Sequence, residues 1–229
     1  MEDIDAIAML QDPVRRRLYE YVAAQGREVG RNEAAEAVGV GRTLAAHHLD
    51  RLVEAGLLES GSRRLSGRSG PGAGRPARVY MRVPTEFAVS LPARDYRTAA
   101  ELLAEAAEEA GLDAGLGAAA RRRGEALRGA AVPCGDLDEA MDVLAARGYE
   151  PHLVESGTSE GGTEAVAPVV RMRNCPFHAV SERFPPLVCG MNLALLEGLL
   201  GADGSVRARM DARPGECCVV VELSKNNEH

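Results

Sequence analysis

Five cysteines and one nearby histidine are the residues of this 229-residue chain with the most distinctive chemistry. Four of the cysteines stand toward the C-terminus, and the histidine follows the first of these four by three positions. Thiolates and imidazole nitrogens bind Zn²⁺, and thiolates hold iron–sulfur clusters. We therefore expect a metal or thiol site in the C-terminal part. Its candidate ligands are Cys175, Cys189, Cys217, Cys218 and His178.

The expected secondary structure places two of these cysteines at the ends of elements. Cys175 follows a strand expected at 166–173. Cys189 immediately precedes a strongly apolar helix expected at 190–200, and a helix N-terminus favours the thiolate form of a cysteine. Segments that end in this way can bring their thiols to one point.

The doubled cysteine leaves the ligand set ambiguous. Cys217 and Cys218 open a strand expected at 217–223, and neighbouring side chains of a strand point to opposite faces. We therefore expect one ligand and one core residue. Buried cysteine is also a common small hydrophobe, and the isolated Cys134 carries no pattern. The spacing is not that of paired C-x-x-C motifs, so cysteines without a metal stay an alternative.

A catalytic function finds little support in the sequence. Cys175 and His178 could form a nucleophile and base, but no Asp or Asn is placed to orient the imidazole. The chain has no G-x-S-x-G, P-loop or G-x-G-x-x-G motif. Its N-terminus is acidic, unlike a signal peptide, and no apolar run approaches the roughly 20 residues that span a bilayer. We therefore expect a cytoplasmic protein that is not an enzyme and has no membrane partner.

The N-terminal third has the spacing of a helix-turn-helix followed by a strand pair. Apolar residues, Ile7 among them, recur every three or four positions through 5–24. A short helix ending at Gly39 and a tight turn lead into a second helix at 44–55 that carries an apolar stripe. Strands are expected on both sides of the loop at 61–76, which is rich in Gly, Ser and Arg. Two strands around a basic loop have the form of a wing.

The distribution of charge suits a DNA-binding N-terminal part. The whole chain has a net charge of −7, but residues 1–94 hold 14 Lys/Arg against 12 Asp/Glu and residues 95–229 hold 13 against 22. No acid lies between Glu59 and Glu86, a stretch that contains six arginines. The field at a DNA surface is set by charges within about 10 Å at physiological salt, so this local excess outweighs the net charge.

The second helix of a helix-turn-helix enters the major groove with the solvent-facing residues of its N-terminal end. Arg42 is expected to contact guanine, Thr43 a phosphate or a base, and Ala46 a thymine methyl group. The wing arginines would meet phosphates or the minor groove. The expected DNA-binding residues are Arg42, Thr43, Ala46, His47, Arg51, Arg63, Arg64, Arg68, Arg75 and Arg78.

Two runs in this region carry a family resemblance. AEAVGVGRTLAAHHLDRLVEAGLLES, followed by GRPARVYMRV, resembles the N-terminal domain of ArsR/DeoR-type winged-helix regulators. The resemblance implies a double-stranded DNA partner. We expect a homodimer on a palindromic operator, because two-fold symmetry reads two half-sites at once. The Ala/Glu/Arg-rich helical stretch that begins at Tyr96 is expected to be a linker and dimerisation segment.

A second resemblance concerns the C-terminal part. RNCPFHAVSERFPPLVCGMNLALLEGLLG, ending in PGECCVVVEL, is similar to the C-terminal domain of SufR-type repressors, which control genes for iron–sulfur cluster assembly. The resemblance implies a repressor whose DNA affinity depends on a [4Fe-4S] cluster. It implies Cys175, Cys189 and Cys217 as ligands, with Cys218 competing for the third position and His178 available as a fourth ligand.

These patterns predict an α+β protein in three parts. We expect a winged helix-turn-helix domain at 1–88, a helical linker and dimerisation segment at 89–132, and a cysteine-containing α+β sensor domain at 133–229. Two alternatives stay open for the sensor domain. One is a Zn²⁺ site or thiol switch on the same cysteines, and the other is a metal-free module whose apolar helix 190–200 lines a pocket for a small effector.

Overall fold

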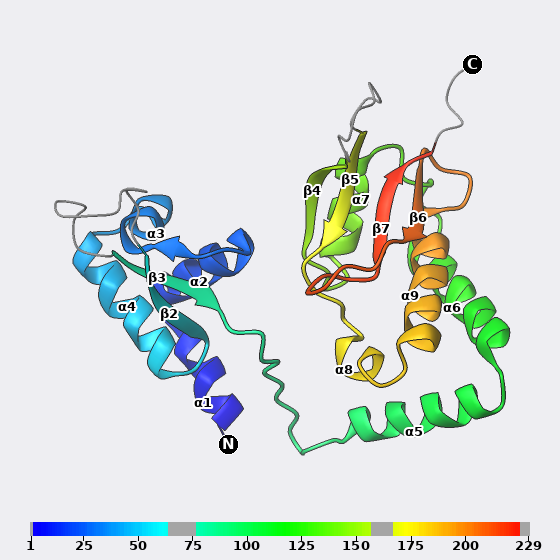
Figure 1. The fold of residues 1–229 in the computed structure, drawn as a ribbon, viewed down its shortest axis with the longest axis horizontal. Coiled ribbons are helices and arrows are strands. Elements are labelled where there is room, and N and C mark those ends of the chain that lie inside the picture. The colour runs from blue at the N-terminus through cyan, green and yellow to red at the C-terminus, as the bar shows by residue number, and fades with distance from the viewer. Residues whose placement is uncertain (1, 64–76, 157–166, 225–229) are drawn as a thin grey trace. The chain divides into compact units, whose positions relative to one another are not determined.

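The computed structural model describes residues 2–63, 77–156 and 167–224, and it has the α+β fold that the sequence predicts. The chain forms two compact units, Met1–Arg94 and Asp95–His229, each with a sheet and a core of its own (Figure 1). None of the helices among the described residues combines the length and the apolar character that a membrane crossing requires.

The helices of the N-terminal unit begin and end at capping residues. The Asp12 carboxylate accepts hydrogen bonds from the backbone N–H groups of Val14 and Arg15, at 2.9 Å each, and so starts α2. Gly39 ends α3 in the left-handed conformation, with φ 72°. The helices of this unit are α1 (Glu2–Ala8), a 3-10 turn (Met9–Gln11), α2 (Pro13–Gln25), α3 (Arg31–Val38) and α4 (Arg42–Glu54).

A three-stranded antiparallel sheet completes this unit. Its strands are β1 (Val29–Gly30), β2 (Leu58–Arg63) and β3 (Ala77–Arg82), in the order β1–β3–β2. Ser60 pairs with Tyr80, and Arg63 pairs with Ala77. β2 and β3 are therefore the expected strand pair on either side of the basic loop, and the tip of that loop lies outside the described residues.

The core of the N-terminal unit confirms most of the predicted apolar pattern. Leu18, Val22, Leu49 and Leu52 are fully or almost fully buried together. Ile7, which the periodicity groups with them, is 39% exposed. The 3-10 turn interrupts the helix after α1, so a 3.6-residue period does not carry across the break.

The C-terminal unit has a four-stranded antiparallel sheet, and two of its helices, α7 and α9, pack on one face of that sheet. The strand order is β4 (Pro151–Ser156), β5 (Ala167–Met172), β7 (Val219–Leu223) and β6 (Val206–Met210). The helices are α5 (Tyr96–Glu109), α6 (Asp113–Arg128), α7 (Leu137–Ala145), α8 (His178–Ser181) and α9 (Pro185–Leu200).

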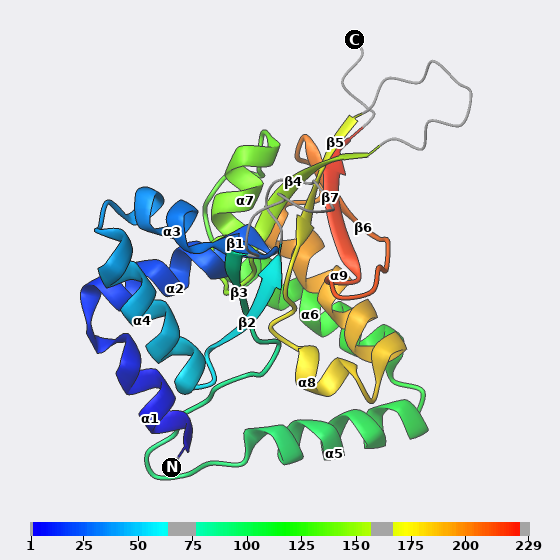
Figure 2. The ribbon, with the colours of Figure 1, turned by 60° about the vertical axis from the view of Figure 1, so that its left-hand side comes forward.

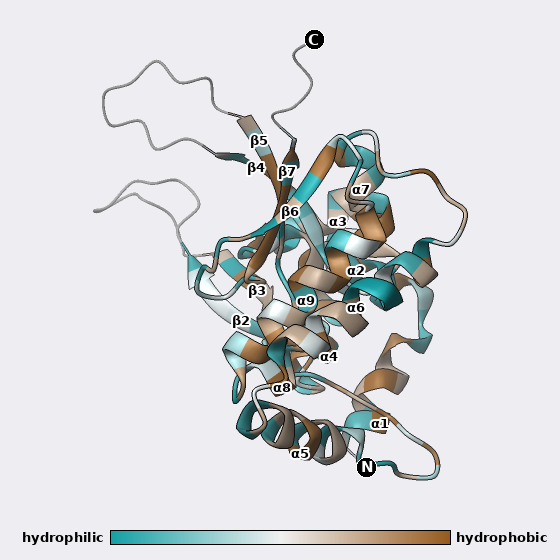
Figure 3. Cartoon of the chain, turned by 90° about the vertical axis from the view of Figure 1, so that its right-hand side faces the viewer, coloured by the Kyte–Doolittle hydropathy of each residue, from teal (hydrophilic) through white to brown (hydrophobic). Residues whose placement is uncertain are grey.

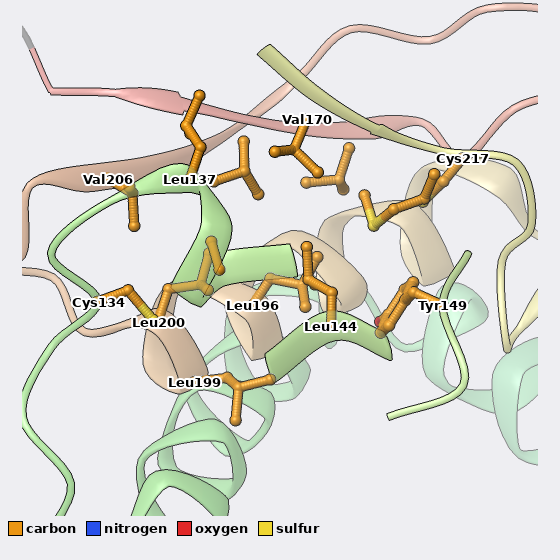
Figure 4. Close-up of a cluster of buried hydrophobic side chains, with 14 residues drawn as sticks. Cys134, Leu137, Leu144, Tyr149, Val170, Leu196, Leu199, Leu200, Val206 and Cys217 are labelled. Atoms are coloured by element: carbon orange, nitrogen blue, oxygen red, sulfur yellow. The ribbon is translucent and has the colours of Figure 1, made fainter. Parts of the chain in front are cut away.

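α9 is the central helix of this unit, and Figure 3 shows its mostly hydrophobic colouring. Leu196 and Leu200 pack against Leu144 of α7 and the inward-facing valines of β5 and β7 (Figure 4). Because every second residue of β5 and β7 is buried in this core, both helices cover the same face of the sheet.

α6 and α9 run side by side in Figures 1 and 2, and two glycines let their backbones touch. A Cβ atom on Gly124 would lie 2.1 Å from the carbonyl oxygen of Leu195. A Cβ atom on Gly198 would lie 2.2 Å from the carbonyl oxygen of Arg121. The expected linker segment therefore packs, through α6, into the second compact unit.

Two expected element boundaries are wrong near the cysteines. α9 begins at Pro185 rather than at 190, because proline is well suited to the first positions of a helix. Cys189 consequently lies inside α9 instead of before it. β7 begins at Val219, and a bend precedes it, so Cys217 and Cys218 are not part of the strand.

Candidate functional site

α4 presents a polar face to solvent, while its opposite face is fixed in the core of the N-terminal unit. Ala45, Leu49 and Leu52 are fully buried. Ala46 is half-buried at the edge of the exposed face. The predicted DNA-binding residues of α4 that are exposed are Arg42, Thr43, His47 and Arg51.

His48 anchors α4 to α2. The side chain is buried, and Arg15 donates a hydrogen bond from Nε to Nδ1 of His48 at 3.4 Å. Arg15 also donates to the carbonyl oxygen of Met9, at 3.1 Å, and so ties α4 to the 3-10 turn. Burial lowers the pKa of His48. His48 therefore lies on the buried side of α4, and its neighbour His47 faces solvent.

A buried tyrosine joins α4 to the sheet. Tyr80 of β3 donates a hydrogen bond to the carboxylate of Asp50 at 2.8 Å and accepts one from Arg31 at 3.4 Å. Burial raises the pKa of Tyr80. α3, α4 and the strand pair are therefore held as one rigid frame for the exposed face of α4.

The wing arginines differ in how far their charge is offset. Arg78 lies 3.1 Å from Asp50 and also bonds Ser60, and Arg63 lies 3.6 Å from Glu28. Surface pairs of this kind are weak and can be exchanged for phosphate contacts. Three further predicted residues, Arg64, Arg68 and Arg75, lie outside the described residues.

A groove of about 930 Å³ runs between the start of α3, the start of α4 and the two wing strands. Arg31, Arg42 and Arg78 line it, with Ser60 and Ser62. Backbone N–H groups at a helix start and arginine side chains both bind phosphate oxygens. The sequence reasoning missed Arg31, although its place at the first position of a helix within a helix-turn-helix is a usable signal.

The cysteines of the C-terminal unit are held by backbone and side-chain contacts. The backbone N–H of Cys217 donates to Met172 at 2.9 Å, and the carbonyl oxygen of Cys218 accepts from the backbone of Asp211 at 2.8 Å. Arg171, which is 1% exposed, pairs with Asp211 and, at 3.1 Å, with Glu216. Both ends of the turn that precedes Cys217 are therefore tied to β5.

Asn174 fixes the position of the neighbouring Cys175. Its amide oxygen accepts a hydrogen bond from the backbone of Glu150 at 2.6 Å, and its amide nitrogen donates to the carbonyl oxygen of Gly148 at 2.7 Å. The residue before Cys175 is thus bound to the turn between α7 and β4.

The four C-terminal thiols gather into one cluster. Cys217 is buried, and Cys175, Cys189 and Cys218 are half-buried. Cys175 and Cys218 pack against the core that contains Cys217, and these three thiols lie close enough to shift one another's pKa, with Cys189 adding to the shift of Cys218. The expectation that Cys217 and Cys218 point to opposite faces is therefore wrong, because the bend before β7 turns both side chains to the same side.

Within this cysteine cluster, Cys217 is the thiol whose negatively charged form is favoured. Hydrogen bonds from Cys175 and Cys218 hold the pKa of Cys217 well below its usual range. The same contacts raise the pKa of Cys175 and of Cys218, and burial adds to both increases. A thiolate at Cys217 is thus stabilised by two thiol donors.

Two polar residues beside the cluster were not predicted. Asn192 of α9 is fully buried and donates a hydrogen bond from its amide nitrogen to the Cys217 sulfur at 3.4 Å. Tyr149, 5% exposed, donates to the amide oxygen of Asn192. A lone asparagine within the apolar run of α9 was the signal that could have identified the pair.

His178, the fifth predicted ligand, and Cys134, for which no role was predicted, have other partners. The His178 side chain is 67% exposed and lies 3.4 Å from the Glu182 carboxylate. Cys134 lies at the opposite end of the core from Cys217 (Figure 4), where its backbone N–H bonds Leu200. Burial raises the pKa of Cys134, which is the behaviour of a structural cysteine.

The donor set of the cysteine cluster fits a thiophilic metal centre. Four partly or fully buried sulfur atoms suit Zn²⁺ or an iron–sulfur cluster. Their contacts form a chain of pairs, however. Across the ranges that the structure describes, no three His, Cys, Asp or Glu side chains converge on one metal position.

Comparison with known families supports the N-terminal assignment. Residues 10–61 match the family model of a helix-turn-helix domain, a region that runs from the 3-10 turn into β2. Comparisons with the curated proteins and with the solved structures gave no match. The helix-turn-helix class predicted for the N-terminal part is therefore confirmed, and the resemblance of the C-terminal part to SufR-type repressors stays a prediction.

Proposed function

We propose that this chain is a DNA-binding transcription regulator that acts as a repressor. A thiol-bound cofactor in the C-terminal unit sets its affinity for the operator. The observation that carries the DNA-binding part is the exposed polar face of α4, which lies within the region that matches a helix-turn-helix domain. The groove lined by Arg31, Arg42 and Arg78 supports phosphate contacts beside that face.

The two kinds of DNA contact have separate roles in this proposal. Arg42 and Ala46 read base edges in the major groove, since a guanidinium matches guanine and a methyl group packs on thymine. The wing arginines and Arg31 bind phosphates, which fixes the orientation of α4 but carries little sequence information. Each phosphate contact also makes the affinity depend on salt.

The proposed cofactor is a [4Fe-4S] cluster bound by Cys175, Cys189 and Cys217. Cys218 is the alternative residue for the third ligand position. Support comes from the all-sulfur donor set and from the sequence resemblance of this region. Such a cluster supplies a redox state and a sensitivity to iron and oxygen. The alternative is a Zn²⁺ ion or a thiol switch on the same residues. The short distances between the thiols favour this alternative, because a [4Fe-4S] cluster holds its cysteine ligands farther apart.

The protein's own contacts offer a route from the thiols to the DNA. Cys175 follows β5, Cys189 lies in α9 and Cys217 precedes β7, so a rearrangement of their sulfur atoms changes how α9 packs on the sheet. α9 touches α6 backbone to backbone at Gly124 and Gly198. A shift of α9 therefore moves α6, and α5 with it.

We propose that α5 contributes the contact between two copies of the chain. Tyr96, Leu102 and Leu103 are 74%, 61% and 72% exposed. With Ala99 and Ala106 they form a wide apolar surface on one side of the helix, while glutamates occupy the other side. A dimer formed here would set the spacing of two α4 helices on a palindromic operator.

Two measurements on the full chain test this function. The first selects duplexes from a random DNA library by binding and reports the recovered sequences and their dependence on salt. Recovery of a palindrome with a steep salt dependence supports the proposal, and no binding above that of an unrelated acidic protein contradicts it.

The second measurement identifies the cofactor. Protein purified without oxygen is assayed for iron, sulfide and zinc, and its visible absorption is recorded. Matched iron and sulfide with a broad band support the [4Fe-4S] proposal. About one zinc per chain supports the alternative site, and protein without iron or zinc removes the cofactor part of the proposal.

A further inference from the structure

Asn192 is a buried polar residue in an otherwise apolar part of α9. It is 0% exposed and lies among alanines and leucines of α9, on the side that faces the core. Burying an amide costs free energy unless its hydrogen bonds are made. A leucine here would fill similar space without that cost, so this buried polar group needs an explanation.

The hydrogen bonds of Asn192 are directed at one sulfur atom. The Tyr149 hydroxyl donates to the amide oxygen, which leaves the amide nitrogen to donate to the Cys217 sulfur at 3.4 Å. Tyr149 and Asn192 therefore form a buried chain of donors that ends at Cys217.

Cys217 and its neighbour Cys218 differ in this respect. In the described part of the chain, the Cys218 sulfur interacts with the thiols of Cys217 and Cys189. The Cys217 sulfur, in contrast, accepts a hydrogen bond from an N–H donor. N–H donors favour a sulfur atom that carries negative charge, as a metal-bound thiolate does. Hydrogen bonds to ligand sulfurs also tune a metal centre and orient its ligands.

We infer that Asn192, held by Tyr149, is the positioning residue of the cysteine cluster: it fixes the Cys217 sulfur and selects Cys217 over Cys218 as the ligand of a thiophilic metal. The inference rests on the proposed function of the cluster as a cofactor site. It also explains why the helix that carries Cys189 keeps an amide in its core.

The test compares the full wild-type chain with the double variant Tyr149→Phe/Asn192→Leu. The double variant replaces both partners by apolar groups of similar shape, so its unfolding free energy should be unchanged or higher. The probe is Co²⁺ alone, titrated without oxygen and followed by the absorption of thiolate-bound cobalt. We expect the affinity for Co²⁺ to fall about 10- to 100-fold and the thiolate band to change shape.

Single-cysteine variants provide the matched controls. Cys134→Ala, at the far end of the core, should bind Co²⁺ as the wild type does. Cys217→Ser should lose the thiolate band, and Cys218→Ser should retain most of it. Equal loss in both serine variants would overturn the selection of Cys217.

The remaining outcomes separate the inference from the proposed function. A wild-type chain without a thiolate band overturns both. A wild-type chain that binds Co²⁺, with a double variant of the same affinity and spectrum, overturns the inference and leaves the cofactor site standing. A double variant that loses several kcal/mol of stability shows that the pair serves the fold rather than the sulfur.

Discussion

Arg42 stands at the first position of α4, faces solvent and lines the groove beside the wing. Among the described residues it has no ion-pair partner, unlike Arg51, which lies 2.6 Å from Glu54. We expect Arg42→Ala to weaken binding to the selected operator by about 1–3 kcal/mol, or roughly 5- to 150-fold in Kd. Fluorescence anisotropy at one fixed salt concentration measures this change.

The matched control is Arg147→Ala, which removes the same charge from an exposed position in the C-terminal unit. It should leave the operator Kd within about twofold, because net charge contributes only a screened, long-range field. Equal loss in both variants would mean that α4 does not read the DNA.

His48 gives the N-terminal unit a dependence on pH. Burial places its folded-state pKa below the unfolded value of about 6.5. Below that pH the unfolded chain binds a proton that the folded unit excludes, so the unfolding free energy falls as the pH drops. One proton limits the loss to about 1.4 kcal/mol per pH unit.

Urea unfolding of the wild type and of His48→Gln, at about pH 7.5 and about pH 5.5, isolates this effect. The wild type should lose more stability between the two pH values than the variant does. The same loss in both proteins would show that another group, such as His152, whose pKa burial also lowers, carries the dependence.

Residue types were predictable here, but their local geometry was not. All four C-terminal cysteines were recognised as one group, yet the side-chain directions of Cys217 and Cys218 depend on a bend that has no turn signature of its own. Asn192 and Tyr149 were missed because they are 43 positions apart and meet only where α9 packs against the turn between α7 and β4.

At the scale of elements, the contact between α6 and α9 depends on glycine. We expect Gly198→Ala to cost about 1–3 kcal/mol or more in unfolding free energy, since the new methyl group would press on the backbone of α6. Gly190→Ala in the same helix meets nothing within 4 Å and should stabilise by up to about 1 kcal/mol. Urea titration measures the unfolding free energy of both variants. Similar changes in the two variants would contradict the backbone contact between α6 and α9.

The exposed apolar side of α5 leads to a prediction about assembly. Leu103→Glu should raise the dimer dissociation constant at least tenfold, because an unpaired carboxylate in an apolar interface is costly. Glu105→Gln, on the charged side of the helix, should have little effect. Sedimentation equilibrium measures both, and a monomeric wild type or an unaffected variant would rule out this interface.

Element types were read correctly over most of the chain, and the errors fall at boundaries. α9 starts five residues before the predicted position because Pro185 and Pro186 occupy its first turn, where proline is well tolerated. The strand pair of the wing followed from its alternating pattern. The packing of α6 on α9 could not be predicted, because small residues in a helix do not reveal their partner.

For the whole molecule, the central question is whether the two units communicate. The N-terminal unit carries the exposed face of α4, and the C-terminal unit carries the cysteine cluster, each within a core of its own. The proposed regulation requires that a change among the thiols alters DNA affinity. Coupling between sites in proteins typically amounts to about 1–3 kcal/mol.

The most direct measurement is the operator Kd of the full chain with and without its cofactor, repeated for Cys217→Ser. We predict a change of about 5- to 150-fold between the two states of the wild type and no change in the variant. Equal affinity in both states of the wild type, or a cofactor-dependent change that persists in Cys217→Ser, would contradict regulation through this cysteine cluster.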